Sequence, residues 1–324
     1  MAKAIILHGG AGKWSLSPPE RRERAKEVVE DCTKRGWKIL VESDDPVKAV
    51  VEAIKCMEDS GVLNAGVGSV LDLLGGRGLD AGIMSSNGLL GAVGGVSATR
   101  NPIELARIVA EETPHILLVG SGADEFARIK KLPPLPPPPR RVVELYHKYI
   151  RELIGDKSTR PYIEAMRRFI EKNSVYRDFV ESIAKLVISD TVGACAVNSR
   201  GLLVAGVSTG GLLLKLPGRV GDSSIPGAGF YADELVACSA TGIGEKIIES
   251  MPCMRLSMEY ANTRDLGRAS SSVLEYVNKR VGTDTVGFIA VDREGGVAWR
   301  FNTEALLVGY AREGELYVKL EGLE

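Results

Sequence analysis

The four residues Asp-Thr-Val-Gly occur twice in this chain, at 190–193 and at 284–287. Each copy is followed by an apolar run, a short polar turn and a second apolar run. Apolar runs separated by turns rich in Asn, Asp and Gly are typical of β-hairpins. We therefore expect two hairpins, the first turning at Asn198–Gly201 and the second at 292–296. Both copies are therefore expected to have a structural role, and the open question is whether one of them also contains a catalytic residue.

Elsewhere the apolar spacing alternates between the periods of strands and of helices. The expected elements are a buried strand at 3–8, amphipathic helices at 19–40 and 46–59, and strands with tight turns across 62–97. A further helix begins after Asn101, which we expect to act as its N-cap ahead of Pro102. This mixture predicts an α+β fold.

A change in composition divides the chain near its middle. The segment KLPPLPPPPRR at 131–141 cannot form a helix or a central strand, so we expect exposed, extended chain there. Residues 142–188 are charged and helical in pattern, with little Gly. We interpret 132–190 as a Pro-rich and helical linker that is mobile once the chain is cut behind it.

The composition excludes several classes of partner. The chain has 324 residues, a hydrophobic fraction of 44% and a net charge of −1, which argue against a nucleic-acid or membrane partner. No apolar run approaches the roughly 18 residues of a membrane-spanning helix. The first residues predict a strand rather than a signal peptide, so we expect a cytoplasmic protein.

Cysteine and glutamine usage add two expectations. The five cysteines are scattered and form no C-x-x-C pair, so we expect buried thiols rather than a metal or redox motif. They are Cys32, Cys56, Cys195, Cys238 and Cys253. The chain contains no glutamine, and depletion of thermolabile amides is typical of heat-adapted proteins.

Three motifs suggest other enzymes and fail on inspection. HGGAG at 8–12 and GVSTG at 206–210 resemble the oxyanion loop and nucleophile elbow of serine esterases, with Ser208 as nucleophile. That fold requires a histidine after the serine, whereas His8, His115 and His147 all precede it. GAGKW at 10–14 lacks the Ser or Thr of a Walker motif.

A threonine can act as a nucleophile without a side-chain base. If the chain is cut immediately before it, the new α-amine, with a pKa of about 7.7–8.0, can accept the hydroxyl proton. Thr191 follows a removable segment and begins a strand, whereas Thr285 has only the strand. We therefore expect cleavage between Asp190 and Thr191, with Thr285 remaining part of the scaffold.

Eight motifs then carry a specific resemblance. From Ile5 to Tyr310 the chain resembles the plant-type asparaginase / isoaspartyl peptidase family, which are N-terminal-nucleophile (Ntn) hydrolases and threonine peptidases. The motifs are LHGGAG, LNAGVGSV, LDAGIM, GAVGGVSATRNPIELAR, DTVGACAV, STGGLLLKLPGRVGDSSIPGAGFYA, ATGIGE and FNTEA, in the family's order. The resemblance is weakest across 132–188.

This resemblance implies a fold and an assembly. We expect one Ntn-hydrolase domain over 1–324, built as a four-layer αββα sandwich and made as an inactive precursor. Self-cleavage would give an α chain, 1–190, and a β chain, 191–324, and two such units would pair as (αβ)2.

The resemblance also implies catalytic roles. Thr191 is the expected nucleophile, with its freed amine as base and Thr209 hydrogen-bonded to it. Asn64 corresponds to the residue that bonds the Thr191 amine. Thr241 and the N–H of Gly242 correspond to the oxyanion hole.

Other residues are expected to bind the substrate's amino-acid head. Arg219 suits an α-carboxylate bound through two hydrogen bonds, while Asp222 and the Gly244 carbonyl suit an α-ammonium. The alternative is that Arg219 and Asp222 form an ordinary surface ion pair, which contributes about 0–1 kcal/mol.

The resemblance implies no cofactor for catalysis and one structural ion. A sodium ion would be held by the backbone of Met57, Glu58, Ser60, Leu63, Ala65 and Val67. Asp190 departs from the Gly found before the nucleophile in many of these asparaginases. It is either active in self-cleavage or simply the residue at the cut.

The expected activity is hydrolysis of β-aspartyl dipeptides and L-asparagine, so the expected partners are small molecules. A glycosylasparaginase is disfavoured because nothing marks secretion. A threonine endopeptidase would need long docking loops within a β chain of 134 residues. A silent amino-acid-binding protein would keep Arg219 and Asp222 but would never expose the Thr191 amine.

Overall fold

The structure is a computed structural model that describes residues 2–154, 161–173 and 191–323. Its strands are β1 (Ala4–Gly12), β2 (Leu79–Ser85), β3 (Leu90–Val96), β4 (Leu117–Val119), β5 (Thr191–Val197), β6 (Leu203–Thr209), β7 (Phe230–Ala232), β8 (Val236–Gly242), β9 (Val286–Asp292), β10 (Val297–Phe301), β11 (Ala305–Arg312) and β12 (Glu315–Glu321). Its helices are α1 (Pro19–Ser43), α2 (Pro46–Asp59), α3 (Pro102–Glu112), α4 (Gly120–Ile129), α5 (Arg140–Ile154), α6 (Pro161–Glu171), α8 (Gly244–Ser250), α9 (Pro252–Thr263) and α10 (Leu266–Val281). The expected α+β composition is confirmed.

The strands form two sheets. The larger has the order β12-β11-β1-β5-β6-β2-β3-β4 and is antiparallel except for the β3–β4 pair. The smaller has the order β10-β9-β8-β7 and is antiparallel throughout. The hairpins β5–β6 and β9–β10 are those expected after the two Asp-Thr-Val-Gly copies. In the first turn, Asn198 Oδ1 accepts from the N–H groups of Arg200 and Leu202.

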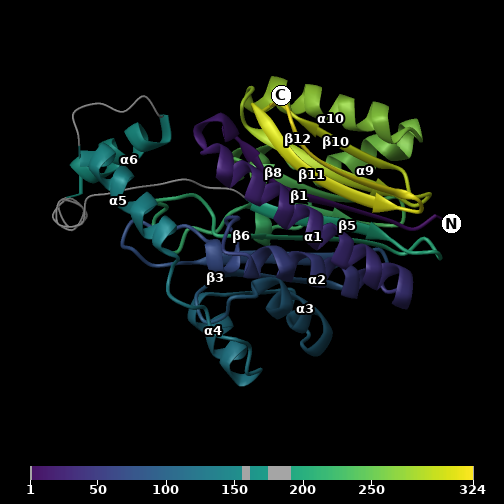
Figure 1. Ribbon diagram of the computed structural model, residues 1–324, viewed down its shortest axis with the longest axis horizontal. Helices are drawn as coiled ribbons and strands as arrows, with labels where there is room; N and C mark the ends of the chain where they lie inside the picture. The colour runs from purple at the N-terminus through teal and green to yellow at the C-terminus, as the bar shows by residue number, and fades with distance from the viewer. Residues whose placement is uncertain (1, 155–160, 174–190, 324) are drawn as a thin grey trace.

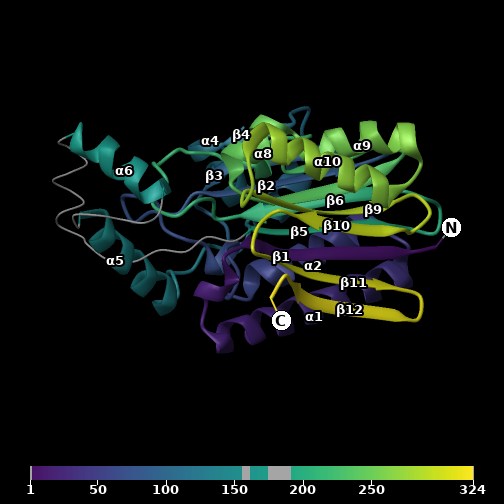
Figure 2. The ribbon, with the colours of Figure 1, turned by 90° about the horizontal axis from the view of Figure 1, so that it is seen from above.

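Apolar side chains fill the space on both sides of the larger sheet. In β1, Ile5 and Leu7 pack toward α1, α2 and α3, while Ala4 and Ile6 pack toward the smaller sheet. This alternation is the period of two that a strand imposes. A third cluster fills the outer face of the smaller sheet beneath α8, α9 and α10. The two groups of helices therefore lie on opposite sides of the paired sheets (Figures 1 and 2).

Helices α1 and α2 lie where apolar spacing predicts them, and Asn101 stands at the N-cap position of α3 ahead of Pro102, as expected. The Asn101 side chain, however, makes no capping bond. Its Nδ2 donates instead to Glu58 Oε2 at 3.1 Å and to Asp59 Oδ1 at 3.0 Å. Glu58 is fully buried, and its Oε1 accepts from the Ile103 N–H at 3.1 Å, so Glu58 makes the bond to the first turn of α3 that the Asn101 side chain does not make.

The Pro-rich segment packs on the body of the protein. Thr99 Oγ1 donates to the Pro133 carbonyl at 2.9 Å, and Arg77 donates to the Pro136 carbonyl. Leu132 and Leu135 pack against the main core. Residues 132–139 form no helix or strand, as expected, but they are half-buried in places rather than fully exposed, and Arg140 and Arg141 already belong to α5.

Helices α5 and α6 form a small apolar core of their own with two loops of the body. Their buried side chains contact Val70, Leu71 and Leu73 on one loop and Leu213 and Leu214 on another. The Tyr146 hydroxyl also donates to the Leu73 carbonyl at 3.1 Å. The two helices lie beyond one end of the sheets in both views (Figures 1 and 2). Mobility of this segment after cleavage stays a prediction, and Asp190 lies outside the described residues.

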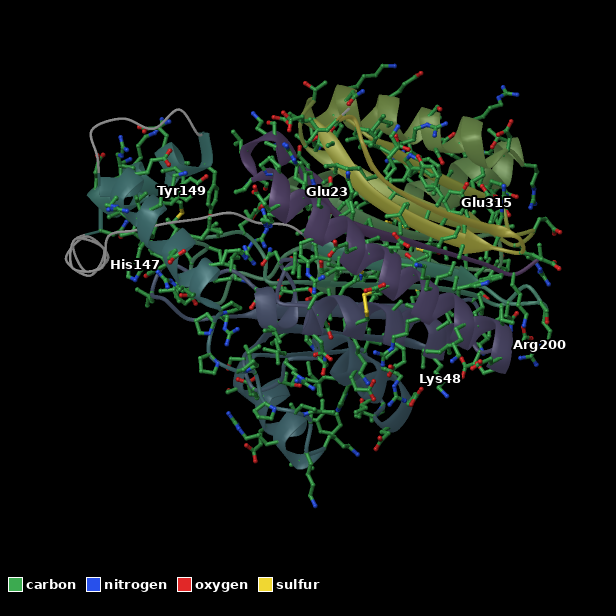
Figure 3. All side chains as sticks on the ribbon, in the orientation of Figure 1. Glu23, Lys48, His147, Tyr149, Arg200 and Glu315 are labelled. Atoms are coloured by element: carbon green, nitrogen blue, oxygen red, sulfur yellow. A yellow bond between two sulfur atoms is a disulfide. The ribbon has the colours of Figure 1, made fainter. Side chains whose placement is uncertain are left out.

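The cysteine prediction is wrong for two of the five. Cys32 in α1 and Cys56 in α2 form a disulfide with a Cα–Cα distance of 5.5 Å, drawn as a yellow bond in Figure 3. Cys195, Cys238 and Cys253 are free and buried, as expected. The pair is 24 residues apart in sequence and meets only because α1 and α2 pack side by side. Across the described ranges, no helix is both long and apolar enough to cross a membrane.

Removing the disulfide should destabilise the protein. Replacing both Cys32 and Cys56 with Ala should lower the free energy of unfolding by on the order of 3 kcal/mol, because the cross-link restricts the unfolded chain. Denaturant unfolding with and without reductant measures this. Reductant should destabilise the wild type and leave the double variant unchanged.

Counting thiols provides the control for that experiment. Alkylation of the denatured wild type should label three cysteines before reduction and five after it. Labelling of all five before reduction would contradict the disulfide.

Candidate active site

The expected nucleophile begins strand β5 and lies opposite Thr209 at the end of β6. The two hydroxyl oxygens, Thr191 Oγ1 and Thr209 Oγ1, are 3.1 Å apart, and both side chains are buried. The Gly211 N–H donates to Thr209 Oγ1 at 2.9 Å. With that acceptor position occupied, the Thr209 O–H can donate to Thr191 Oγ1.

Asn64 lies beside this threonine pair. Its Nδ2 donates to the Gly211 carbonyl at 3.0 Å, its Oδ1 accepts from the Val70 N–H at 2.8 Å, and its carbonyl accepts from the Gly210 N–H. A Cβ at Gly210 would lie 2.3 Å from Asn64 Oδ1, so only glycine fits there. Asn64 thus fixes the turn after Thr209, and its bond to a freed Thr191 amine stays a prediction.

The packing of the two sheets brings Thr241 to the same end as Thr191. A Cβ at Gly193 of β5 would lie 2.1 Å from Ser239 Oγ of β8, so these two residues face each other closely. Thr191 precedes Gly193 by two positions and Thr241 follows Ser239 by two. Since side chains at i and i+2 share a face, both threonines project at this end.

The Thr241 hydroxyl accepts from the Ala11 N–H at 3.2 Å, which leaves its O–H available to donate. The next residue, Gly242, has φ of +135°, a region that favours glycine. A Cβ there would lie 2.2 Å from the Thr285 carbonyl oxygen. The turn from β8 into α8 is therefore built for glycine, which fits the expected oxyanion hole.

Arg219, Asp222 and Gly244 are brought together beside the threonines. A Cβ at Gly244 would lie 2.5 Å from Arg219 Nη2 and 2.8 Å from Asp222 Oδ1. A Cβ at Gly211 would lie 3.2 Å from Arg219 Nη1. The guanidinium therefore lies beside the turn that follows Thr209, where the Gly211 N–H donates to Thr209 Oγ1.

The sequence did not identify the carboxylate that Arg219 pairs with. Arg219 Nε and Nη2 donate to Glu245 Oε1 and Oε2, each at 3.0 Å. The Arg219 side chain is only 16% exposed, so a surface pair with Asp222 is not what forms. Burial alone would lower the pKa of Arg219, but the Glu245 carboxylate raises it. The guanidinium therefore stays charged.

Asp222 is a buried carboxylate with an unused oxygen. Its side chain is 5% exposed, and its Oδ2 has no hydrogen-bond partner among the described residues. Burial raises the pKa of Asp222 to about 7, although the charge of Arg219 acts in the opposite direction. An unsatisfied buried carboxylate is costly, and a cationic ligand would relieve that cost.

Two further buried charged side chains, Asp80 and Lys215, support Arg219 and Asp222, and the sequence analysis did not identify them. Asp80 Oδ2 accepts from the Gly221 N–H at 2.9 Å and its Oδ1 from the Gly95 N–H at 2.8 Å. Lys215 Nζ donates to the Gly78 carbonyl at 2.6 Å, and burial lowers the pKa of Lys215. Asp80 lies in the LDAGIM motif, which offered a signal, but no spacing rule connects it to Gly221.

The serine-esterase alternative fails on geometry. The Ser208 hydroxyl donates to Glu58 Oε1 at 2.7 Å inside the core. His8 lies instead with its Nε2 3.1 Å from Ser239 Oγ. Burial lowers the pKa of His8 to about 3, so the ring is neutral. His8 pairs with Gly193 in the sheet and so lies beside the strand that carries Thr191.

The loop expected to hold sodium follows α2 and includes the 3₁₀ turn Gly66–Gly68. A Cβ at Gly66 would lie 2.7 Å from the Glu58 carbonyl oxygen, and one at Gly68 would lie 2.2 Å from that of Leu63. A side chain at either position would clash with these carbonyl oxygens, so only glycine fits at Gly66 and Gly68. No cluster of three or more His, Cys, Asp or Glu side chains suited to a metal occurs in the described residues.

Comparison with known proteins agrees with this geometry. The asparaginase family model matches residues 1–319. The chain belongs to the asparaginase family. Plant-type L-asparaginase of Pyrobaculum calidifontis is 38% identical over 326 residues, covering 98% of this chain and 99% of that protein. Plant-type L-asparaginase of Pyrococcus abyssi is 37% identical over 313 residues (96% and 97%), and isoaspartyl peptidase of Escherichia coli is 33% identical over 322 residues (97% and 95%).

The raised pKa of Asp222 gives this asparaginase-family site a testable pH dependence. The carboxyl is protonated below about pH 7 and then no longer attracts an ammonium group. The dissociation constant of L-aspartate, measured by calorimetry, should therefore rise by about tenfold for each pH unit below that pKa.

Asp222→Asn is the matched control for the pH measurement. It should bind L-aspartate weakly at every pH and show no such slope. An identical slope in the Asn variant would assign the titration to another group.

Proposed function

We propose that this chain is an autoprocessing threonine amidohydrolase that hydrolyses β-aspartyl dipeptides and L-asparagine to L-aspartate and an amine or ammonia. One observation carries the proposal: the hydroxyls of Thr191 and Thr209 are paired, and the turn after Thr209 meets the buried Arg219, with Asp222 next to the same guanidinium. A nucleophile next to sites for a carboxylate and an ammonium suits a free amino-acid head. The names of the relatives support the same activity.

Maturation would cut the bond between Asp190 and Thr191 and give chains 1–190 and 191–324. Two facing sheets between two sets of helices support an Ntn-type four-layer αββα sandwich over the single domain. Strand β5 then runs through the middle of the larger sheet, so the new terminus would be held rigidly. We infer pairing of two such units as (αβ)2 from the family resemblance.

In the mature enzyme the Thr191 amine would take the proton from its own hydroxyl as Oγ1 attacks the side-chain carbonyl. The Thr209 O–H donates to Thr191 Oγ1 and orients it, while Asn64 would hold the amine. Negative charge developing on the carbonyl oxygen would be stabilised by the Thr241 hydroxyl and the Gly242 N–H. The ammonium of Thr191 would protonate the departing amine, and water would release aspartate from the ester.

The head of the substrate would be held by opposite charges. The guanidinium of Arg219 would bind the α-carboxylate, and Asp222 with the Gly244 carbonyl would bind the α-ammonium. With the head fixed, the reactive carbonyl must lie beyond the β-carbon, separated from the α-carbon by one methylene, to reach Thr191.

The same resemblance supports a structural sodium ion in the loop after α2. The backbone of Met57, Glu58, Ser60, Leu63, Ala65 and Val67 would supply neutral oxygens, which suit a hard monovalent cation. The Glu58 and Leu63 carbonyls lie close to Gly66 and Gly68, so two of these six oxygens meet the tightly folded turn after α2. No chemical step is assigned to the ion.

Self-cleavage can be tested with a matched pair of threonine variants. Purified protein should show a new N-terminus TVGACAV and a chain of 134 residues. Thr191→Ala should remain one 324-residue chain, because the nucleophile is gone. Thr285→Ala, which changes the other Asp-Thr-Val-Gly copy, should still be cut. Intact mass and N-terminal sequencing decide this, and a cut Thr191→Ala would refute the assignment.

A panel of four compounds tests the substrate. β-Asp-Leu and L-Asn should both be hydrolysed, because the inferred site specifies the aspartyl head and not the leaving amine. α-Linked Asp-Leu should be resistant, since its carboxylate and scissile carbonyl are exchanged. L-Gln should react more slowly than L-Asn, because the extra methylene misplaces the carbonyl. Released aspartate or glutamate is the readout.

The outcomes separate the alternatives. Equal hydrolysis of the α- and β-linked dipeptides would favour the threonine endopeptidase. Selective activity on N-glycosylated asparagine would favour a glycosylasparaginase. Binding of L-aspartate without cleavage of the chain would favour the silent amino-acid-binding protein.

A further inference from the structure

Glu245 is the carboxylate that engages Arg219, and nothing in the proposed reaction uses it. We infer that Glu245 is a positioning residue for substrate selection: it holds the guanidinium by one edge, so that the other edge stays available for the α-carboxylate. This inference rests on the proposed function and extends it to the control of the head-binding site.

The geometry of the ion pair leaves the right atoms available. Glu245 takes Nε and Nη2, which are the side edge of the guanidinium. A guanidinium has five N–H donors, so Nη1 and the second N–H of Nη2 can still bind a carboxylate through two parallel bonds. Of the guanidinium atoms, Nη1 is the one nearest to Gly211, on the side of the turn that follows Thr209. The available edge therefore belongs to the side where the substrate head is expected.

Three glycines surround the guanidinium and limit how it can turn. A Cβ at Gly221 would lie 2.7 Å from Nη1, one at Gly244 would lie 2.5 Å from Nη2, and one at Gly211 would lie 3.2 Å from Nη1. The backbone thus approaches the guanidinium on several sides, and the ion pair with Glu245 restricts its remaining freedom to rotate. Its place in the first turn of α8 also favours a negative charge.

The charge arrangement explains why such a hold is needed. Asp222 lies beside the same guanidinium with its Oδ2 unpaired among the described side chains. Without Glu245, Arg219 and Asp222 would attract each other and form an internal ion pair. That pair would occupy both groups that recognise the substrate. Glu245 prevents this by giving Arg219 a carboxylate outside the head-binding site.

The test compares Glu245→Ala and Glu245→Gln with a matched control on the same helix. Glu249 is also in α8, but it pairs with Lys246 and Arg280 on the surface, so Glu249→Ala should behave as wild type. Glu245→Ala should raise KM for L-Asn by up to about fivefold, with a smaller change in kcat, because the Glu245 side chain is 53% exposed and solvent screens its pair with Arg219. Glu245→Gln, which keeps one acceptor oxygen, should fall between the two.

A double-variant cycle separates positioning from a general structural effect. Once Arg219→Ala has removed the guanidinium, adding Glu245→Ala should change the dissociation constant of L-aspartate by less than about twofold. Cleavage before Thr191 should proceed in all variants, because neither residue contacts the nucleophile. Additive losses in the cycle, or a KM for Glu245→Ala equal to or below that of the wild type, would overturn the inference. A wild-type enzyme inactive on L-Asn would instead refute the proposed function.

Discussion

The register between β5 and β6 determines whether this site can exist. Thr191 lies opposite Thr209, which places their hydroxyl oxygens 3.1 Å apart. Because neighbouring side chains point to opposite faces, a shift of one residue would turn the nucleophile away from its partner. Both faces of these strands are buried, by helices on one side and the smaller sheet on the other. The core therefore fixes the register, and the register sets the chemistry.

Local patterns in the sequence were sufficient for the two hairpins and for helices α1 and α2. Helix α2 has the bounds that apolar spacing gave, and the first hairpin turns at Asn198, whose side chain accepts from the N–H groups of Arg200 and Leu202. Such features depend on neighbours in the chain, which a sequence displays directly. The set of site residues came instead from the family resemblance, and their catalytic and binding roles stay predictions.

The sequence could not show which of several residues far away in the chain each of these side chains would contact. Cys32 meets Cys56, Asn101 binds Glu58 instead of capping its helix, and Arg219 pairs with Glu245 rather than Asp222. Each choice was open to several chemically equivalent residues, and packing decided among them. For the same reason the sequence does not reveal the raised pKa of Asp222, because that pKa depends on burial and not on residue type.

The two Asp-Thr-Val-Gly copies show how packing alone separates scaffold from chemistry. The Thr285 hydroxyl donates to the Gly282 carbonyl at 2.9 Å, and its N–H donates to Asn302 Oδ1 at 2.9 Å. Both groups are thus committed to backbone and amide partners that stabilise a turn. Thr191 instead meets another hydroxyl, which can either donate or accept and so can follow a change of charge on Oγ1. The same four residues therefore hold the turn that leads into β9 in one copy and, in the proposed reaction, present the nucleophile in the other.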